Sequence, residues 1–343
     1  MARALGVPAS RATDAFNSEG FQMRLSILNS GLLAGVLVST PLFASPTVYI
    51  ATSDTDEVIV MDGEKNVIIG KITGLEKPHE VVATPDGQYL VAGSLQEEPM
   101  DDTNFSVIER RSGQVKFKIP MSGWSYHQVV TPDGRYVLST KPFEGQVRVV
   151  DLDSRQVIKL IAAGSAANHL LLSNDGRYVY VSNERDDSIS QIDVSTWSVT
   201  QVMPAGRAPG HMVMSPDGKL IYVTSHDTDR VSAVSVSLGE VVHSCRVGKG
   251  LHGIEIGDDG KTLFVSSRTD DTLYVLDASI QKRAQRMLKL SPAPYHVKVI
   301  KGTGKVYVAS HQSPKLWVID QTTLEVLDEI DLPAVGHHME VVY

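Results

Sequence analysis

Residues 78–94 read PHEVVATPDGQYLVAGS: a histidine, a short apolar run, an Asp-Gly turn and a second apolar run that ends in a small polar residue. The same pattern returns along the chain, and its copies begin at His79, His127, His169, His211, His252 and His296. The intervals between these histidines are 48, 42, 42, 41 and 44 residues, and a further 41 or 42 residues lead to His337 or His338. A period of about 40 to 45 residues built from short strands is typical of a propeller blade.

The two ends of the chain indicate how the last blade is completed. Three strand-like runs from residue 47 onward, TVYIATS, DEVIVMD and NVIIGKITG, have no inner partner of their own. The C-terminal GHHMEVVY is an inner strand without the three that follow it in the other copies. Joining the two ends completes one four-stranded blade and leaves no free sheet edge in the ring. The sequence therefore predicts an all-β fold, a seven-bladed β-propeller with four-stranded blades.

The composition fits one globular body and excludes some classes of partner. The chain has 343 residues, of which 42% are hydrophobic, and a formal net charge of -8. Duplex nucleic acid and anionic membrane surfaces both need a basic face, so neither is expected as a partner. Cys245 is the single cysteine, so neither an internal disulfide nor a CxxC metal or c-type haem attachment motif exists.

The first residues resemble a targeting segment. Residues 23–44 contain a basic residue, an apolar run and a small residue, Ala44, at the expected cleavage point, which resembles a secretory signal peptide. The apolar run is also just long enough for a membrane anchor. Residues 1–22 show neither charge pattern nor periodicity and are interpreted as a misassigned upstream start. We therefore expect a single propeller over residues 45–343, located in the periplasm and without a membrane span after signal cleavage.

One blade carries a family resemblance. Residues 178–193, YVYVSNERDDSISQID, together with TPDG or SPDG before the matching strands, resemble the YVTN-type β-propeller repeat. That repeat is shared by YncE-like periplasmic proteins and cytochrome d1-like propellers. The resemblance implies the propeller fold across the whole of the mature chain. It implies less about function, because the same scaffold carries binding proteins, tetrapyrrole proteins and enzymes.

The recurring histidines form the candidate metal site. The first strand of each blade lines the central channel, so histidines at the starts of these strands should gather at one mouth. The candidate metal ligands are His79, His127, His169, His211, His252, His296, His337 and His338. Their spacing to the turn glycine is not uniform. In three of the six full copies the histidine lies eight residues before that glycine, at His79, His252 and His296, and in the other three it lies seven residues before, at His127, His169 and His211. Either a bulge absorbs the difference or the histidines form two layers of three.

Imidazole chemistry suggests which ion such a site would hold. Neutral imidazole is a common ligand for zinc and copper, and nitrogen-rich sites favour Cu(II) in the usual stability order. Copper is therefore the favoured ion and zinc the alternative. The structural alternative is that the histidines hydrogen-bond strand backbones and ordered water in a polar channel mouth.

Further polar residues fall where the second strand of each blade ends, at the same rim. The candidates for cofactor binding there are Lys141, Arg185, Arg268, His226 and His311. They could bind carboxylates or orient the channel histidines; the alternative is that they are solvated loop residues. If the resemblance to the cytochrome d1-like propellers extends to ligand, the cations would pair with the propionates of a d1-type haem.

No catalytic motif accompanies these residues, since the sequence lacks a Gly-rich phosphate loop, a GxSxG elbow and HExxH. We therefore expect an exported propeller that binds a metal ion or small ligand in an accessory role, with enzymatic activity less favoured. A propeller that binds or matures d1-type haem is the first alternative. The second is a YncE-like scaffold that binds a periplasmic protein and holds no cofactor.

Overall fold

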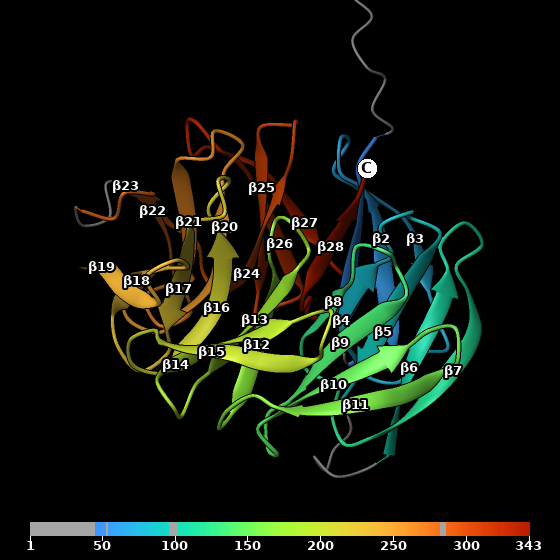
Figure 1. Ribbon diagram of the computed structural model, residues 1–343. Coiled ribbons are helices and arrows are strands. Elements are labelled where there is room, and N and C mark those ends of the chain that lie inside the picture. The colour runs from blue at the N-terminus through green and yellow to red at the C-terminus, as the bar shows by residue number, and fades with distance from the viewer. Residues whose placement is uncertain (1–44, 53, 96–101, 282–285) are drawn as a thin grey trace, which may run out of the picture. The chain divides into compact units, whose positions relative to one another are not determined.

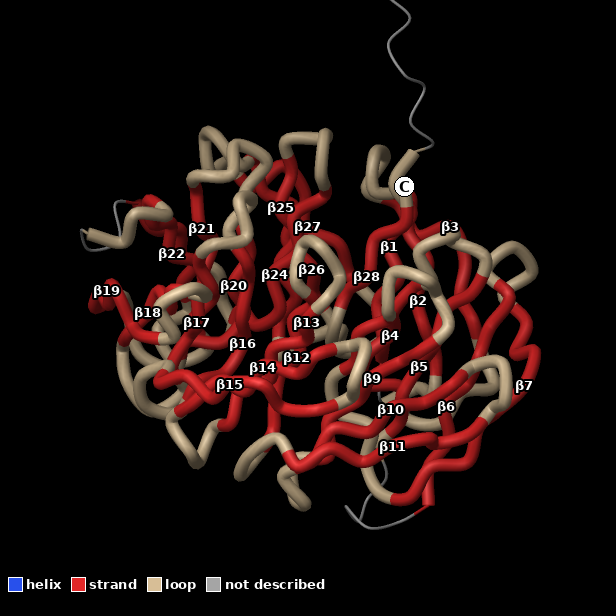
Figure 2. The backbone as a smooth tube through the Cα atoms, viewed as in Figure 1, coloured by secondary structure: helices blue, strands red, loops and turns tan. Residues whose placement is uncertain are grey.

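The computed structural model describes residues 45–52, 54–95, 102–281 and 286–343. The expected signal segment and upstream start lie outside these residues. The described residues form 28 strands in seven four-stranded antiparallel sheets, and no helix among them is long and apolar enough to cross a membrane. Figures 1 and 2 show the sheets following one another in chain order. The predicted seven-bladed, all-β propeller is confirmed.

Each blade contributes one strand to each of four concentric positions. The innermost strands are β4 (Pro78–Ala83), β8 (Gln128–Val130), β12 (Ala167–Leu172), β16 (Pro209–Met214), β20 (Leu251–Ile256), β24 (Pro294–Ile300) and β28 (Met339–Val342). The second strands are β1 (Thr47–Thr52), β5 (Tyr89–Ser94), β9 (Tyr136–Lys141), β13 (Tyr178–Asn183), β17 (Leu220–Ser225), β21 (Thr262–Ser267) and β25 (Lys305–Ser310). The third strands are β2 (Glu57–Asp62), β6 (Asp102–Glu109), β10 (Gln146–Asp151), β14 (Ser188–Asp193), β18 (Arg230–Ser235), β22 (Thr272–Asp277) and β26 (Lys315–Asp320). The outermost strands are β3 (Val67–Ile72), β7 (Gln114–Ser122), β11 (Gln156–Ala162), β15 (Ser198–Pro204), β19 (Glu240–Arg246), β23 (Arg286–Lys289) and β27 (Val326–Asp331).

The ring closes by pairing strands from the two ends of the chain. The C-terminal β28 pairs antiparallel with β1, Met339 opposite Ile50, and completes the blade whose other strands are β2 and β3. In Figure 1 the red β28 lies beside the blue β1–β3 blade. Neighbouring innermost strands contact one another all the way round, from β4 through β24 and β28 back to β4. The shared blade predicted from the sequence is confirmed.

The recurring Asp-Gly turns are explained by local hydrogen bonds. In the hairpin after β4, the Thr84 hydroxyl donates to the Asp86 carboxylate (2.6 Å), which also accepts from the backbone N–H of Gln88 (3.0 Å). Gly87 follows with φ at 65°, a left-handed conformation that favours glycine. The same Thr/Ser-Asp hydroxyl bond recurs in the next three copies at Asp133, Asp175 and Asp217.

Apolar side chains on the faces of the sheets make seven clusters, each between two neighbouring blades. Trp317 of β26, only 2% exposed, packs with Phe264 of the preceding blade. Burial of one such large side chain contributes on the order of 2–3 kcal/mol. The packing between blades fixes the innermost strands, and these carry the candidate site.

Candidate metal centre in the bore

A β-bulge near the start of the innermost strands sets the geometry of the site. Five of these strands show a register shift there, for example between Pro78 and Glu80 in β4 and between Leu251 and Ile254 in β20. An extra residue on one strand breaks the strict alternation of side chains. Two consecutive positions can therefore face the bore, and they make two layers.

The two layers are defined by aligning the seven strands on their pairing with the second strand of each blade. The outer layer holds His79, Tyr126, Asn168, Gly210, His252, Tyr295 and His337. The inner layer holds Glu80, His127, His169, His211, Gly253, His296 and His338. The two layers contain three and five histidines, so the alternative of two layers of three is wrong. Counting back from the turn glycine groups His296 with His252, but strand pairing places His296 in the inner layer. The count is off by one because Gly304 lies one position later in its hairpin than Gly260 does in the preceding blade.

All eight candidate histidines belong to one connected histidine cluster. Their ring centroids are linked through neighbours at 4.3–6.1 Å. His211 has four such neighbours and lies 4.3 Å from His252 and 5.1 Å from His296. Each of these three residues offers a ring nitrogen, and the three nitrogens lie within 4.8 Å of one another. The three side chains come from three successive blades.

Burial leaves many of the imidazole nitrogens without a partner. His79, His127, His211, His252 and His296 are 2–5% exposed. Within the described residues, one ring nitrogen each of His79, His127, His211, His252, His296, His337 and His338 is buried without a hydrogen bond. His169 differs, because its Nδ1 accepts from the backbone N–H of Met212 at 3.4 Å. Buried polar groups are normally satisfied, so these nitrogens call for ligands or ordered water.

The same burial keeps the imidazoles neutral. Desolvation lowers the pKa of His127 to about 3 and that of His337 to about 4, from an ordinary value of 6.5. It also holds the pKa of every other histidine in the cluster well below that value, and neighbouring imidazoles add to the effect. Neutral imidazole is the form that ligates metals. The cluster is therefore deprotonated before any ion arrives.

Glu80 occupies the inner-layer position that histidine takes in five other blades. Its carboxylate lies 3.3 Å from Nδ1 of His127 and 3.1 Å from Nε2 of His338, and it accepts from the backbone N–H of Gln128 at 2.5 Å. Glu80 is 3% exposed, and burial raises the pKa of its carboxyl to about 8 despite that hydrogen bond. Glu80 was not among the residues predicted from the sequence. When PHEVV and YHQVV are aligned on their histidines, Glu80 falls opposite Gln128, whereas backbone pairing places Glu80 level with His127.

Aromatic side chains close the outer layer. Tyr295 stacks on His252 with ring centroids 3.7 Å apart, and Tyr126 stacks on His79 at 4.5 Å. Of the predicted cofactor-binding residues, His311 packs against Tyr295 at 4.4 Å. The exposed Arg268 guanidinium lies over the same Tyr295 ring at 5.4 Å.

His226 also packs against the outer layer, next to Gly210. A Cβ built on Gly210 would lie 2.1 Å from Nε2 of His226. It stacks on His252 at 5.4 Å, and its Nδ1 lies 3.5 Å from Glu184. That contact lowers the pKa of the Glu184 carboxyl. Three of the five predicted cofactor-binding residues, His226, His311 and Arg268, therefore lie against this layer.

The other two do not join it. Lys141 is buried at the end of β9 and pairs with Glu144 at 2.8 Å. Arg185 is exposed, and its backbone N–H donates to the carbonyl of Ser165. In the part of the chain that the structure describes, no hydrogen bond, ion pair or ring contact links either side chain to the histidine cluster.

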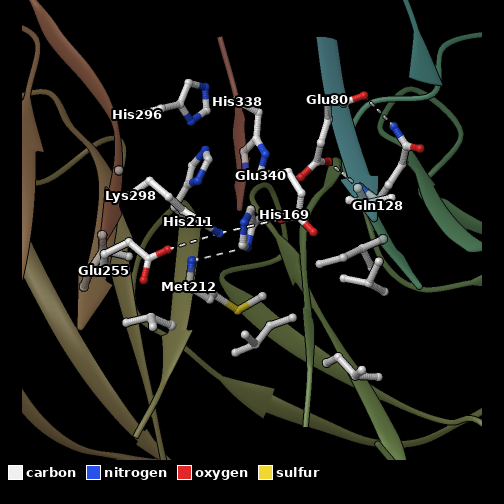
Figure 3. A pocket seen from close by; sticks show the side chains of 18 of the residues that line it. Glu80, Gln128, His169, His211, Met212, Glu255, His296, Lys298, His338 and Glu340 are labelled. Carbon is white, nitrogen blue, oxygen red and sulfur yellow. Dashed lines mark hydrogen bonds and ion pairs between the residues drawn. The ribbon is translucent and has the colours of Figure 1, made fainter. Parts of the chain in front are cut away.

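A cavity of about 310 Å³ reaches the inner layer from the other side (Figure 3). Its lining includes Glu80 and the inner-layer histidines His169, His211, His296 and His338, and no residue of the outer layer. Beyond them it is lined by Glu255, Lys298 and Glu340 on one side and by Gln128 and apolar residues elsewhere. Sequence analysis anticipated the rim near the outer layer and missed this charged group. Each of these three charged residues lies two positions after the inner-layer residue of its strand, so aligning the seven strands at that position would have identified them.

Comparisons with known proteins agree with the architecture. The sequence model of the YNCE-like beta-propeller family matches residues 107–261. No curated protein matches the sequence. Among solved structures, the periplasmic gluconolactonase PpgL of Pseudomonas aeruginosa is similar with a TM-score of 0.70 and 17% identity, over 87% of this chain and 99% of that one.

Two further structures show the same fold at low identity. A putative 6-phosphogluconolactonase from Bacteroides uniformis has a TM-score of 0.75 and 16% identity, over 87% of this chain and 100% of that one. The dihydro-heme d1 dehydrogenase NirN, in complex with DHE, has a TM-score of 0.64 and 14% identity, over 88% of this chain and 68% of that one. These likenesses concern the fold alone. The chain is a seven-bladed β-propeller, and its residues 107–261 match the YNCE-like beta-propeller family.

Proposed function

We propose that the histidine cluster binds a metal ion, with copper favoured over zinc, and that His211, His252 and His296 are its first ligands. The observation that carries the proposal is the convergence of three ring nitrogens within 4.8 Å, on three buried residues that each keep one nitrogen without a partner. In the structural alternative, backbone groups and ordered water satisfy the imidazoles; of these two, backbone groups reach none of the seven unpartnered nitrogens in the described residues.

The ring nitrogens of His211, His252 and His296 are close enough to bind one ion after a small contraction of the site. Nitrogens bound to one tetrahedral zinc at 2.0–2.1 Å lie about 3.4 Å apart. The nitrogens lie within 4.8 Å of one another in this structure, so the imidazoles would have to rotate to close a gap of up to about 1.4 Å when they bind an ion. One ion uses about four ligands. The remaining histidines therefore complete the coordination sphere or hold a second ion.

The donor set decides between the two metals. Neutral imidazole suits both, but a site made of nitrogen ligands binds Cu(II) more tightly than Zn(II) in the usual stability order. Glu80 adds one carboxylate between His127 and His338, an oxygen donor that either ion accepts. When bound, the ion would supply a Lewis-acid or, for copper, a one-electron centre, while the residues hold and orient it.

We place the protein outside the cytoplasm, because residues 23–44 resemble a signal peptide and one similar fold is that of a periplasmic enzyme. In that compartment a binding or accessory role fits best, with cargo transfer to or from a periplasmic protein. No catalytic residue is assigned.

A d1-type haem remains the second candidate, supported by the resemblance to cytochrome d1-like propellers and by the fold of NirN with its bound DHE. The rim residues that would accompany it, Arg268 and His311, lie over Tyr295. A macrocycle at this rim would have to displace the stacked pairs Tyr295–His252 and Tyr126–His79. The geometry therefore favours an ion within the cluster over a planar ligand above it.

Metal content and the visible spectrum of the purified protein test the proposal. We expect stoichiometric copper or zinc and no Soret band in the wild type. The triple variant His211→Gln, His252→Gln, His296→Gln should lose the metal while its circular dichroism stays that of a β-sheet protein. His243→Gln, an exposed histidine on β19, is the matched control and should keep the metal. Retained stoichiometric metal in the triple variant would refute this site, and a Soret band would select the haem.

A further inference from the structure

The two ends of the bore differ in how open they are. On the outer-layer side, His79, His252 and Tyr295 are 3–5% exposed and packed in stacked pairs. On the other side, the cavity of about 310 Å³ is lined directly by four inner-layer histidines (Figure 3). An ion that reaches the histidine cluster without breaking the stacked pairs must cross this cavity.

The route passes one charged group. Lys298 lies two residues after His296 on β24, and its ammonium is 3.6 Å from the Glu255 carboxylate of β20 and 3.9 Å from the Glu340 carboxylate of β28. Figure 3 shows it between these two carboxylates. The equivalent positions in the other four blades are apolar: Val82, Val129, Leu171 and Val213. Among the described residues at this position, three adjacent blades carry a charged side chain, and we call Glu255, Lys298 and Glu340 the bore triad.

Lys298 is held by charge more than by hydrogen bonds. Both of its ion-pair distances exceed the 2.7–3.2 Å of an N–H···O hydrogen bond. Burial opposes its charge, but the carboxylates of Glu255 and Glu340 outweigh that effect and leave the pKa of Lys298 raised. Glu340 is anchored separately, because its Oε1 accepts from the backbone N–H of Ala83 at 3.0 Å. The ammonium can therefore leave without disturbing the carboxylates.

The charge of the cavity wall matches one divalent cation. Glu255 and Glu340 carry two negative charges when ionised, and Lys298 carries one positive charge. Once the ammonium has moved aside, the two carboxylates are compensated by a single ion of charge +2. These half-buried carboxylates need such compensation, since uncompensated charge in a poorly solvated site is costly.

We propose that divalent metal ions enter through this cavity, that Glu255 and Glu340 form their access site, and that the Lys298 ammonium occupies this site until an incoming ion displaces it. The inference rests on the proposed metal binding by the histidine cluster. It adds a second cation site, a direction of entry and a residue that controls the rate. His211 and His296, each with an unpartnered buried Nε2, lie next along the route.

Stopped-flow association of Cu²⁺ and Zn²⁺ with chelator-treated protein tests the proposal. Lys298→Met removes the competing cation and should raise the association rate constant about tenfold. The double variant Glu255→Gln, Glu340→Gln should lower the rate constant at least tenfold. Both changes lie within the range of electrostatic effects on association. Lys315→Met removes a lysine of the same blade that is ion-paired to Glu329 on its outer edge, and should leave the rate unchanged. Arg207→Gln removes an exposed cation beside β16 at the outer-layer end and should also leave it unchanged.

The salt dependence of the wild type gives a readout that requires no variant to fold. A wall of net negative charge attracts the ion, so association should slow several-fold as ionic strength rises from 0.01 to 0.15 M and the Debye length falls from about 30 to about 8 Å. If the wild type takes up no metal, the proposed function itself fails. If it binds stoichiometrically but the triad variants associate at the wild-type rate, or Arg207→Gln alone changes the rate, the histidine site stands and entry through the bore triad is refuted.

Discussion

Acid should unfold the metal-free protein well above the pH at which carboxylates titrate. Eight histidines are held neutral by burial, with the pKa of His127 lowered to about 3 and that of His337 to about 4. In the unfolded chain the same groups titrate near 6.5. Below that pH the unfolded chain takes up protons that the native state excludes. Stability is therefore present above about pH 6.5 and is lost as pH falls toward the native pKa values.

The magnitude follows from linkage. Each histidine that stays neutral in the native state costs about 1.4 kcal/mol of stability per pH unit below 6.5, so eight remove about 10 kcal/mol between pH 7 and pH 5.5. Glu80 acts in the opposite direction: its native pKa of about 8 lies above the unfolded value, so its cost shrinks as pH falls. It returns about 2 kcal/mol over the same interval. The net loss of about 8 kcal/mol compares with a total stability of about 5–15 kcal/mol for a typical domain.

Urea unfolding of chelator-treated protein at pH 8, 7, 6 and 5.5, followed by tryptophan fluorescence and circular dichroism, measures this loss. We expect the free energy of unfolding to fall steeply below pH 6.5 and the native state to be lost between pH 6 and 5. His127→Gln should reduce the slope by about one proton, or about 1.4 kcal/mol per pH unit. A free energy of unfolding that stays within about 1 kcal/mol from pH 7 to 5.5 would show that the imidazoles titrate freely in the native state, and would refute the reasoning.

Three further outcomes are expected. Cu²⁺ or Zn²⁺ at about 100 times its dissociation constant should stabilise the protein by about 2.7 kcal/mol and raise the melting temperature by about 4 °C. The triple variant at His211, His252 and His296 should show no shift in thermal unfolding. Gly253→Ala should destabilise by about 1–3 kcal/mol, because a Cβ there would lie 2.6 Å from the backbone oxygen of Tyr295, whereas Gly70→Ala, with nothing within 4 Å, should change the urea midpoint little. Glu80→Gln should raise the free energy of unfolding of the metal-free protein by about 3 kcal/mol at pH 7, since it removes a carboxyl that ionises only on unfolding; a stability at or below that of the wild type would contradict this.

The architecture could be predicted from the sequence because each blade repeats the same pattern of short apolar runs separated by a turn. The Asp-Gly turn, with its hydroxyl–carboxylate bond, marks each hairpin from Thr84 to Ser215. The incomplete runs at the two ends predicted that β28 would pair with β1. Neither prediction required knowledge of contacts distant in the sequence beyond the rule that a ring must close.

The site was predictable only in part because a bulge changes which residues face the bore. Counting from the turn glycine grouped His296 with His79, although pairing places His296 in the inner layer with His211. Glu80 was overlooked for the same reason: its role depends on the register shift after Pro78. Backbone pairing decides such offsets, and histidine spacing alone does not contain it.

The charged residues of the cavity were missed for a different reason. Glu255 and Lys298 each look like an isolated polar residue in an apolar strand, and only the ring arrangement brings them within 3.6 Å of each other. Lys141, in contrast, is the last residue of the second strand β9, close to the rim as predicted. Its ammonium pairs with Glu144, three residues later, and not with the histidine cluster. Position at a strand end thus indicated the rim without indicating the partner.

Crystals of the metal-loaded protein, with data collected at the absorption edge of the bound ion, would locate that ion. We expect an anomalous peak inside the bore, about 2 Å from ring nitrogens of at least three histidines that include His211. A fully loaded crystal with its peak at the rim, and with water hydrogen-bonded to the nitrogens of His211, His252 and His296, would show that the histidine cluster does not hold the ion.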